Sequence, residues 1–260
     1  MKDIKRRSVL NKVIPWIIPI IILIAWQVLT TTGIVAANIF PTPEKVIAGT
    51  ITLIKNGQLT NNILISTKRA VIGFIIGGGI GFVLGLVNGV SRRSEIALDS
   101  TIQMVRNIPH LALMPLVIIW FGIGEEAKLF LISFGVFFPI YLNTLHGIRT
   151  IDSGLVEMGK IYGLKRRALF WNIILPGALP SILVGVRQSL GIMWLTLIVA
   201  EQLAADSGIG YMAMNAREFM QMDVIVLSII IYAVLGKISD SAAKILELKL
   251  LRWHPNYQNN

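Results

Sequence analysis

Long runs without a charged residue recur along this 260-residue chain. The clearest of them, residues 70–90, contains no Asp, Glu, Lys or Arg. A helix of about 20 apolar residues is long enough to cross the hydrocarbon core of a bilayer, whereas shorter apolar runs suit soluble cores. Charged residues make up only 15% of the chain, and soluble domains hold about a quarter. The sequence therefore predicts an all-α, polytopic membrane protein and argues against a soluble enzyme.

Six apolar segments are predicted as membrane-spanning helices. They are residues 13–32, 70–90, 108–123, 129–145, 181–200 and 224–238. A cleaved signal peptide is the alternative for the first segment, because Val35-Ala36-Ala37 has the small residues of a cleavage site. The hydrophobic run is long for a signal peptide and further spans follow, so we favour an uncleaved helix. A short surface helix is predicted over residues 43–54, where apolar residues recur at helical spacing.

The positively charged residues indicate how the spans are oriented. With the N-terminus inside, six spans place residues 1–12, 91–107, 146–180 and 237–260 in the cytoplasm. These segments hold seventeen of the 24 Lys and Arg residues, six lie on the opposite side, and Arg187 lies within a span. Cytoplasmic loops carry such an excess, which predicts that both termini are cytoplasmic. The net charge of +10 is therefore a topology signal, and we expect no nucleic-acid partner.

Glycines form a regular stripe in the second predicted span. They occupy every fourth position, at Gly73, Gly77, Gly81, Gly85 and Gly89. This spacing places them along one face of a helix. Small residues on such a face allow a neighbouring membrane helix to approach closely. We interpret the stripe as a helix-packing surface, and a flexible gate is the alternative.

The loop between the fourth and fifth predicted spans contains the most informative segment. Residues 157–176 have the pattern of a short amphipathic helix, a glycine stop, a basic turn and an apolar stretch ended by a proline. A loop of this length and regularity is unusual for a simple channel. An amphipathic helix that is neither a span nor a tail is suited to a groove on a partner. The segment therefore predicts that another protein docks on the cytoplasmic side.

The spacing of this segment resembles the EAA loop of ABC-importer permease subunits. Its anchors are Glu157, Gly163, Ile173, Leu175 and Pro176. The two residues that follow the glutamate are usually alanines in that family, and here they are Met158 and Gly159. The resemblance implies that residues 157–163 are a coupling helix that sits in a groove of a cytosolic ATPase.

Other segments extend the resemblance over about residues 13–255. Residues 103–122, 138–149, 193–201 and 207–219 are similar to the sulfonate, taurine and nitrate branch of the family, and most of all to aliphatic sulfonate permeases. The resemblance implies a transmembrane domain over residues 60–244, with a cytoplasmic N-terminus (1–12) and a cytoplasmic tail (245–260). It also implies transport of aliphatic sulfonates, with taurine, nitrate or another small anion as the alternative.

The resemblance further implies a set of partners in the cytoplasmic (inner) membrane. They are two copies of a cytosolic ABC ATPase, an extracytoplasmic substrate-binding protein and a second permease copy that completes a homodimer. ATP and Mg²⁺ would bind to the ATPase. This chain lacks the Gly-x-x-x-x-Gly-Lys-Ser/Thr phosphate loop, since its most similar string, Gly236-Lys237-Ile238-Ser239, has no upstream glycine. We therefore expect neither enzymatic activity nor a cofactor in this chain.

Polar and aromatic residues within the spans are candidates for the translocation pathway. They are Arg187, Asn107, His110, Asn143, Trp120 and Trp194. Three alternatives exist for Arg187: snorkelling to the interface, an ion pair, or contact with an anion in transit. Helix capping and packing are the alternatives for Asn107 and His110, and packing or interfacial positions for the tryptophans. Asn143 needs a polar partner, which a neighbouring helix could supply.

Two other classes of function have less support from the residues. An ATP-independent carrier would show inverted repeats or several intramembrane acids, and neither is evident. A membrane metalloprotease would need ligands beside Glu125 and Glu126, but the three histidines are scattered and there is no cysteine, so we expect no metal site. We interpret both glutamates as solvated carboxylates of an extracytoplasmic turn. The acidic loop 201–223 is a candidate surface for the binding protein.

Overall fold

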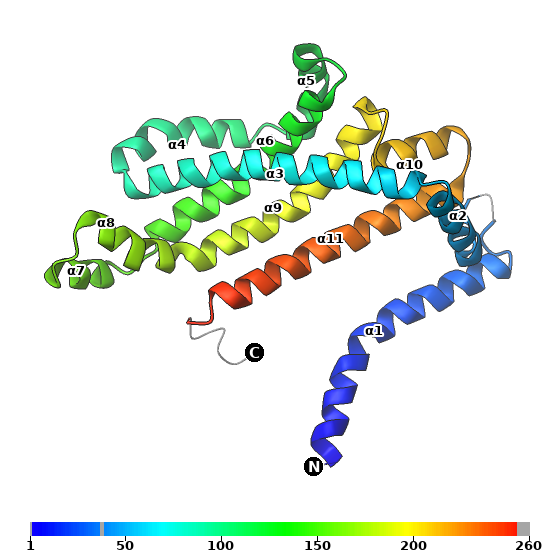
Figure 1. Cartoon of the computed structure of the whole chain (residues 1–260), viewed down its shortest axis with the longest axis horizontal. Coiled ribbons are helices and arrows are strands. Elements are labelled where there is room, and N and C mark those ends of the chain that lie inside the picture. The colour runs from blue at the N-terminus through cyan, green and yellow to red at the C-terminus, as the bar shows by residue number, and fades with distance from the viewer. Residues whose placement is uncertain (1, 37–38, 254–260) are drawn as a thin grey trace. The chain divides into compact units, whose positions relative to one another are not determined.

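The computed structural model describes residues 2–36 and 39–253, and all regular structure within these ranges is helical (Figure 1). The helices are α1 (Lys2–Thr31), α2 (Pro43–Lys55), α3 (Gln58–Val90), α4 (Arg92–Arg106), η1 (His110–Leu113), α5 (Met114–Phe121), α6 (Glu125–Arg149), α7 (Ser153–Ile161), α8 (Arg166–Leu169), η2 (Phe170–Ile174), α9 (Leu175–Ala204), α10 (Ile209–Glu218) and α11 (Met222–Leu250). The predicted all-α class is confirmed. Met1 of the predicted N-terminal segment and residues 254–260 of the predicted C-terminal tail lie outside the described residues.

Helix length and composition identify four candidate spans among the described residues. They are α3, α6, the stretch Arg166–Leu203 that includes most of α9, and α11. The pair Arg92–Arg106 and His110–Phe121 is a fifth candidate, but it is bent by 79°. By the same measure, Ile17–Thr31 in α1 is a shorter apolar helix. The chain is thus a multi-pass membrane protein, and the full set of six spans stays a prediction.

The third predicted span, residues 108–123, is not one continuous α-helix. Its one regular α-helical part, α5, has eight residues, or about 12 Å at helical rise, against a hydrocarbon core of about 30 Å. Pro109 precedes the 3-10 turn η1, and Pro115 lies in the first turn of α5. A proline disfavours helical geometry in the residue before it. The break between α4 and α5 therefore falls where the proline pattern places it, inside the apolar run.

The chain divides into two compact units, which are described separately. One comprises Met1–Asn61 with Met212–Ile230, and the other comprises Asn62–Tyr211 with Ile231–Asn260. In the first unit, the Trp26 indole donates a hydrogen bond to a backbone carbonyl just before α2. The second unit contains every site residue considered below.

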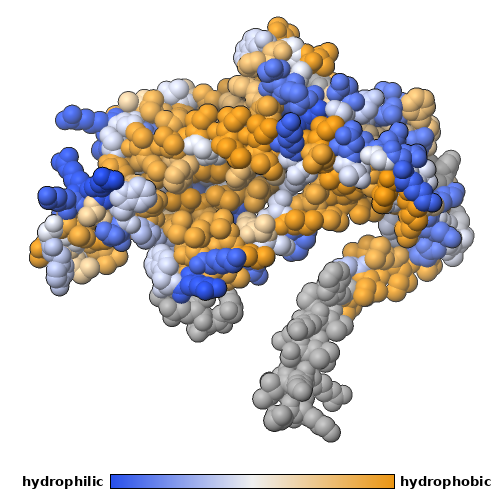
Figure 2. Space-filling model, in the orientation of Figure 1, coloured by the Kyte–Doolittle hydropathy of each residue, from blue (hydrophilic) through white to orange (hydrophobic). Residues whose placement is uncertain are grey.

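A core of apolar side chains from α3, α6 and α9 holds the second unit together. Its buried members are Ala70, Ile132, Val136, Ile140, Met193, Trp194 and Leu197. Figure 2 shows that hydrophobic residues also cover much of the face in view, while hydrophilic residues gather in separate patches, one of them at the end that holds α8. Ile76 and Ile80, for example, are 45% and 53% exposed on α3. Extended apolar surface of this kind suits contact with lipid or with another protein.

The glycine stripe of α3 lies against α6. A Cβ atom on Gly81 would stand 2.5 Å from the carbonyl oxygen of Phe137, and one on Gly85 would stand 2.8 Å from that of Tyr141. The other members of the stripe, Gly73, Gly77 and Gly89, also face residues of α6. The α6 backbone therefore occupies space that a side chain on α3 would need.

α9 packs along α6 and is continuous over thirty residues. A proline inside a helix usually kinks or breaks it, and the apolar stretch 168–200 contains Pro176 and Pro180. However, Pro176 lies in the first turn of α9, where the missing amide costs no hydrogen bond, and the helix continues through Pro180. The irregular part is the preceding π-helical segment η2. One helix therefore runs from the end of the predicted coupling loop to the far end of the fifth span.

Candidate functional site

The predicted coupling helix, residues 157–163, forms the second half of α7 and the turn that ends it. α7 begins after Asp152, whose carboxylate accepts a hydrogen bond from the amide of Gly154 at 2.7 Å. Side-chain caps of this kind satisfy amides that have no partner within the helix. The start of the predicted coupling helix is thus fixed by a local contact.

The end of α7 is a Schellman motif, in which two backbone amides close the last turn. The amide of Gly163 donates to the carbonyl of Lys160, and the amide of Leu164 donates to the carbonyl of Gly159. Gly163 has a φ of +78°. A residue with a Cβ atom loses about 1 kcal/mol or more in this left-handed conformation. The anchor glycine of the loop is therefore required by backbone geometry.

Gly159 is the point at which the loop folds back on itself. A Cβ atom at this buried position would lie 2.6 Å from Ile173 Cδ1 and 2.8 Å from Leu169 Cδ1. The anchor Ile173 thus packs onto Gly159, where the family usually carries an alanine. The last two anchors, Leu175 and Pro176, form the first turn of α9. The whole segment is a compact helical turn attached directly to a spanning helix.

The outer surface of this loop is both apolar and basic. Five large side chains are exposed: Leu155 (48%), Met158 (47%), Ile161 (84%), Tyr162 (80%) and Trp171 (58%). Lys160, Lys165, Arg166 and Arg167 are exposed as well. Glu157 is also exposed. A large exposed apolar patch with a polar rim marks a site of contact with another protein or with a membrane.

Arg187, the intramembrane charge, forms an ion pair with Asp240 of α11. Its side chain is 46% exposed and that of Asp240 is 34% exposed. Lys237 lies 3.8 Å from the same carboxylate. Of the three alternatives for Arg187, the structure shows the ion pair, which joins α9 to α11.

Asn143 and Trp194 also make contacts between helices. The Asn143 amide donates to the carbonyl of Pro139 at 2.8 Å and to Gln188 Oε1 of α9 at 3.2 Å. The buried Trp194 donates from its indole nitrogen to Ser239 Oγ at 2.9 Å. Each contact satisfies a polar atom within the spans, where an unpaired one is costly.

The remaining pathway candidates lie around the α4–α5 break. His110 Nε2 is 3.1 Å from Thr196 Oγ1 of α9. Asn107 ends α4 as its C-cap residue, and Trp120 on α5 is 62% exposed. The structure thus distributes the six candidates over several helices and does not bring them together in one site.

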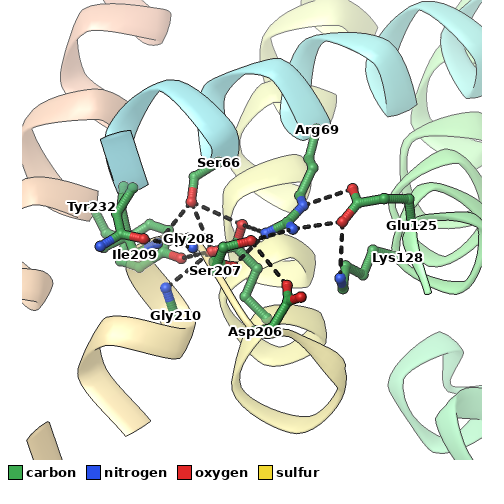
Figure 3. Close-up of polar contacts among 12 residues, drawn as sticks. Ser66, Arg69, Glu125, Lys128, Asp206, Ser207, Gly208, Ile209, Gly210 and Tyr232 are labelled. Carbon is green, nitrogen blue, oxygen red and sulfur yellow. Dashed lines mark hydrogen bonds and ion pairs between the residues drawn. The ribbon is translucent and has the colours of Figure 1, made fainter. Parts of the chain in front are cut away.

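A buried polar cluster, which we call the charge cluster, joins α3, α6, α9 and the connection to α10 (Figure 3). Its centre is the ion pair between Arg69 Nη1 and Glu201 Oε1, at 2.8 Å with side chains 4% and 0% exposed. Arg69 Nη2 also pairs with Glu125 Oε1 at 2.6 Å, and Lys128 donates to the same oxygen at 3.0 Å. Glu125 is 53% exposed, as a solvated carboxylate would be, but it is also bound by two cations, which the sequence interpretation did not include.

Sequence reasoning missed the charge cluster. Arg69 was assigned to an extracytoplasmic loop, and Glu201 to the start of an acidic loop. One signal was present: these two residues are opposite charges, and each borders a charge-free run on the same predicted side of the membrane. At the edge of the cluster, the hydroxyl of Ser207 donates to the Asp206 carboxylate at 3.0 Å and lowers the pKa of Asp206.

Comparison with known proteins relates this geometry to a family. The family model described as "Binding-protein-dependent transport system inner membrane component" matches residues 73–252. The chain is 57% identical to a putative aliphatic sulfonates transport permease protein of Escherichia coli, with 95% of this chain and 94% of the relative covered. The corresponding protein of Bacillus subtilis is 45% identical, with 93% and 88% covered.

A more distant relative and a solved structure are also similar to this chain. The taurine transport system permease protein of Escherichia coli is 31% identical, with 92% of this chain and 88% of the relative covered. A crystal structure of an amino acid ABC transporter with histidines superposes with a TM-score of 0.63 at 16% identity, covering 76% of this chain and 97% of that chain. This likeness extends to the fold alone.

The family resemblance predicted from the loop anchors is confirmed by the extent of these matches. A match over residues 73–252 includes the glycine stripe, the coupling loop and Glu125 and Glu201 of the charge cluster, while Arg69 lies just before the matched range. The chain belongs to the family of inner-membrane components of binding-protein-dependent transport systems, the permease subunits of ABC importers.

Proposed function

We propose that this chain is the membrane-spanning permease of an ATP-driven importer for aliphatic sulfonates. The observation that carries the proposal is the 57% identity over almost the whole chain to a relative named for aliphatic sulfonates. The relatives named for taurine and nitrate are 31% and 28% identical. The difference favours an aliphatic sulfonate other than taurine as the transported anion.

The partners of this importer are two cytosolic ABC ATPase subunits, an extracytoplasmic substrate-binding protein and a second copy of the permease. The exposed apolar and basic surface of α7 supports docking of the ATPase at the coupling loop. ATP and Mg²⁺ bind to the ATPase, which alone hydrolyses ATP. Glu157 lies at the centre of the docking surface, and Gly163 fixes the turn behind it.

The orientation proposed for the chain follows from its cations. Both termini and the coupling loop face the cytoplasm, and the spans lie in the inner membrane. The excess of Lys and Arg in the segments on that side supports this orientation. Of the pathway candidates, Arg187 is the one that we propose to meet the anion, because its guanidinium is half-exposed and already binds a carboxylate.

Uptake in a strain that lacks the chromosomal copy tests the proposal. Wild-type protein should restore uptake of radiolabelled ethanesulfonate, and unlabelled alkanesulfonates should compete better than taurine or nitrate. Stronger competition by taurine or nitrate would reassign the substrate within the family.

Two variants test the coupling loop in the same assay. Glu157→Lys and Gly163→Asp should abolish uptake while the permease still reaches the membrane, because one reverses a docking charge and the other strains the turn. Lys55→Gln, at an exposed lysine of α2 outside the coupling loop, is the control surface change and should retain most uptake. Normal uptake by both loop variants would refute docking at this loop.

A further inference from the structure

Glu201 is a carboxylate buried in a shell of hydrogen-bond donors. Ser66 Oγ lies 2.8 Å and 2.7 Å from its two oxygens. Arg69 Nη1 donates at 2.8 Å, the amide of Gly210 at 2.9 Å, and the hydroxyl of Tyr232 lies at 3.2 Å. A fully buried charge is tolerated only when it is paired and hydrogen-bonded in this way. Glu201 is therefore built into the fold as a fixed anion.

Arg69 is saturated by the same cluster. Its Nε and Nη2 atoms hold the carboxylate of Glu125 at 2.8 Å and 2.6 Å, in a two-pronged contact. Its Nη1 atom donates to Glu201 and, at 2.6 Å, to the carbonyl of Ser207, whose hydroxyl is 3.0 Å from Nη2. The planar guanidinium thus fixes three chain segments in one geometry.

The charge cluster also caps the start of α10. Three consecutive amides, of residues 208, 209 and 210, donate to side chains of other helices. The acceptors are Asn62 Oδ1 and Ser66 Oγ of α3, each at 2.8 Å, and Glu201 Oε2 of α9. Amides at a helix N-terminus have no partner within the helix. The connection from α9 to α10 therefore takes its shape from α3 and Glu201.

The residue types of this connection fit that role. Gly208 has a φ of +109°, and a Cβ atom there would overlap the carboxylate of Glu201. A Cβ atom on Gly210 would lie 2.6 Å from the Cβ of Glu201. At both positions the backbone lies so close to Glu201 that only glycine, which has no Cβ atom, fits.

Stability alone gives no reason for such a cluster. Buried ion pairs are often no more stabilising than well-packed apolar side chains of the same volume, because both charges lose their hydration. Buried charge networks do impose one geometry on the groups that they join. The charge cluster is thus suited to setting the positions of helix ends.

The opposite end of α9 is the end of the coupling loop. Ile173, which packs onto Gly159 of α7, is two residues before the start of α9. Glu201 lies about 39 Å further along the same helix, at about 1.5 Å per residue. Because α9 is continuous between these points, a displacement of the loop reaches the charge cluster through one rigid element.

We propose that Arg69 and Glu201 are positioning residues of the transport cycle, which hold the far end of α9 to α3 and to the first amides of α10. Movement of the coupling loop is carried along α9 to this end and repositions the connection to α10. The inference rests on the proposed function, since it takes residues 157–163 as the ATPase docking site. Glu125, at 53% exposure, is the outer arm of the cluster, and Glu201 is its fixed centre.

The test compares uptake with ATP hydrolysis in proteoliposomes that hold the complete importer. The variants are Glu201→Gln and the double change Arg69→Gln with Glu201→Gln, which leaves no buried unpaired charge. Glu126→Gln, an exposed neighbour of Glu125, is the matched control for loss of one carboxylate. The probe is radiolabelled ethanesulfonate, and the readout is ethanesulfonate imported per ATP hydrolysed.

A positioning role predicts that this ratio falls by about tenfold or more in both cluster variants, because charge-assisted hydrogen bonds are replaced by weaker neutral ones. Basal ATP hydrolysis per assembled complex should stay within about twofold of wild type, since the docking loop is unchanged. Glu126→Gln should keep the wild-type ratio. A merely structural role would lower uptake and hydrolysis together.

Three results would overturn the inference. One is a normal ratio in Glu201→Gln, and another is a normal ratio in the double variant. The third is failure of both variants to assemble, which would assign the charge cluster to folding. Gly163→Asp, measured in the same vesicles, separates the two proposals: normal uptake there refutes the docking loop, whatever the cluster variants show.

Discussion

Replacement of Gly81 by alanine should force α3 and α6 apart. The new Cβ atom would stand 2.5 Å from the carbonyl oxygen of Phe137 and 3.3 Å from the amide nitrogen of Tyr141. An ordinary contact begins at 3.4 Å, so the atom would have to move by 0.9 Å. The obstacle is backbone, which cannot rotate away as a side chain can. The helices must separate, and their contact along the glycine stripe is loosened.

The size of the effect follows from a matched control in the same helix. Overpacking of a close contact costs about 1–3 kcal/mol, while alanine gains up to about 1 kcal/mol over glycine within a helix. A Cβ atom on Gly79 meets nothing within 4 Å. Gly79→Ala should therefore gain the helix propensity of alanine without any overpacking. The two variants should therefore differ by about 1–3 kcal/mol, with Gly81→Ala the less stable.

Unfolding of the purified permease in detergent measures this difference. Equal denaturant series for the wild type and both variants give the relative free energies of unfolding. Gly79→Ala should match or exceed the wild type. If Gly81→Ala were as stable as Gly79→Ala, the close approach of α3 and α6 at the stripe would be refuted.

Three further predictions concern the loop and the α9–α11 contacts. Gly163→Ala should destabilise the turn by about 1 kcal/mol through its positive φ, seen as faster proteolysis at the loop and weaker ATPase binding. Arg187→Gln should raise the ethanesulfonate concentration for half-maximal uptake. It should leave the stability of the permease almost unchanged, because its pair with Asp240 is partly exposed. An unchanged concentration for half-maximal uptake would remove Arg187 from the pathway. Trp194→Phe should lower the free energy of unfolding by about 1 kcal/mol through loss of the hydrogen bond to Ser239, and leave the ethanesulfonate concentration for half-maximal uptake unchanged. A change in that concentration at unchanged stability would place Trp194 in the pathway.

Features with a local cause were accessible from the sequence. The glycine stop at Gly163 follows from one backbone angle, and the packed loop around Gly159 involves residues within fifteen positions. The glycine stripe has a period that matches the helix. The stripe predicts that another helix packs closely against α3. It does not predict that this helix is α6, because that depends on how segments distant in the sequence pack. Glu157 was identified from family spacing alone, since its exposed position makes it unremarkable in the structure.

The helix ends show where charge patterns mislead. Lys68 and Arg69 mark a membrane boundary when charges are simply counted, and the second span was accordingly predicted to start at residue 70. The helix that contains this span, α3, begins earlier, at Gln58, and within it Arg69 is paired with Glu125 and Glu201 inside the protein. A hydropathy scale gives every arginine the same transfer energy. It cannot include the pairing of Arg69 with Glu201, which lies 132 residues away in the sequence.

The same limitation explains why a chain with so few charges places some of them at its centre. An unpaired charge in a span would be expelled toward water, so a buried Arg69 persists only if two carboxylates are held in position around it. Those carboxylates come from α6 and α9, the two helices that flank the coupling loop in sequence. The arrangement therefore makes the electrostatic balance of α3 depend on the relative position of α6 and α9. A machine that moves these helices must keep, exchange or break these contacts, and the partly exposed Glu125 is the contact that breaks at lowest cost.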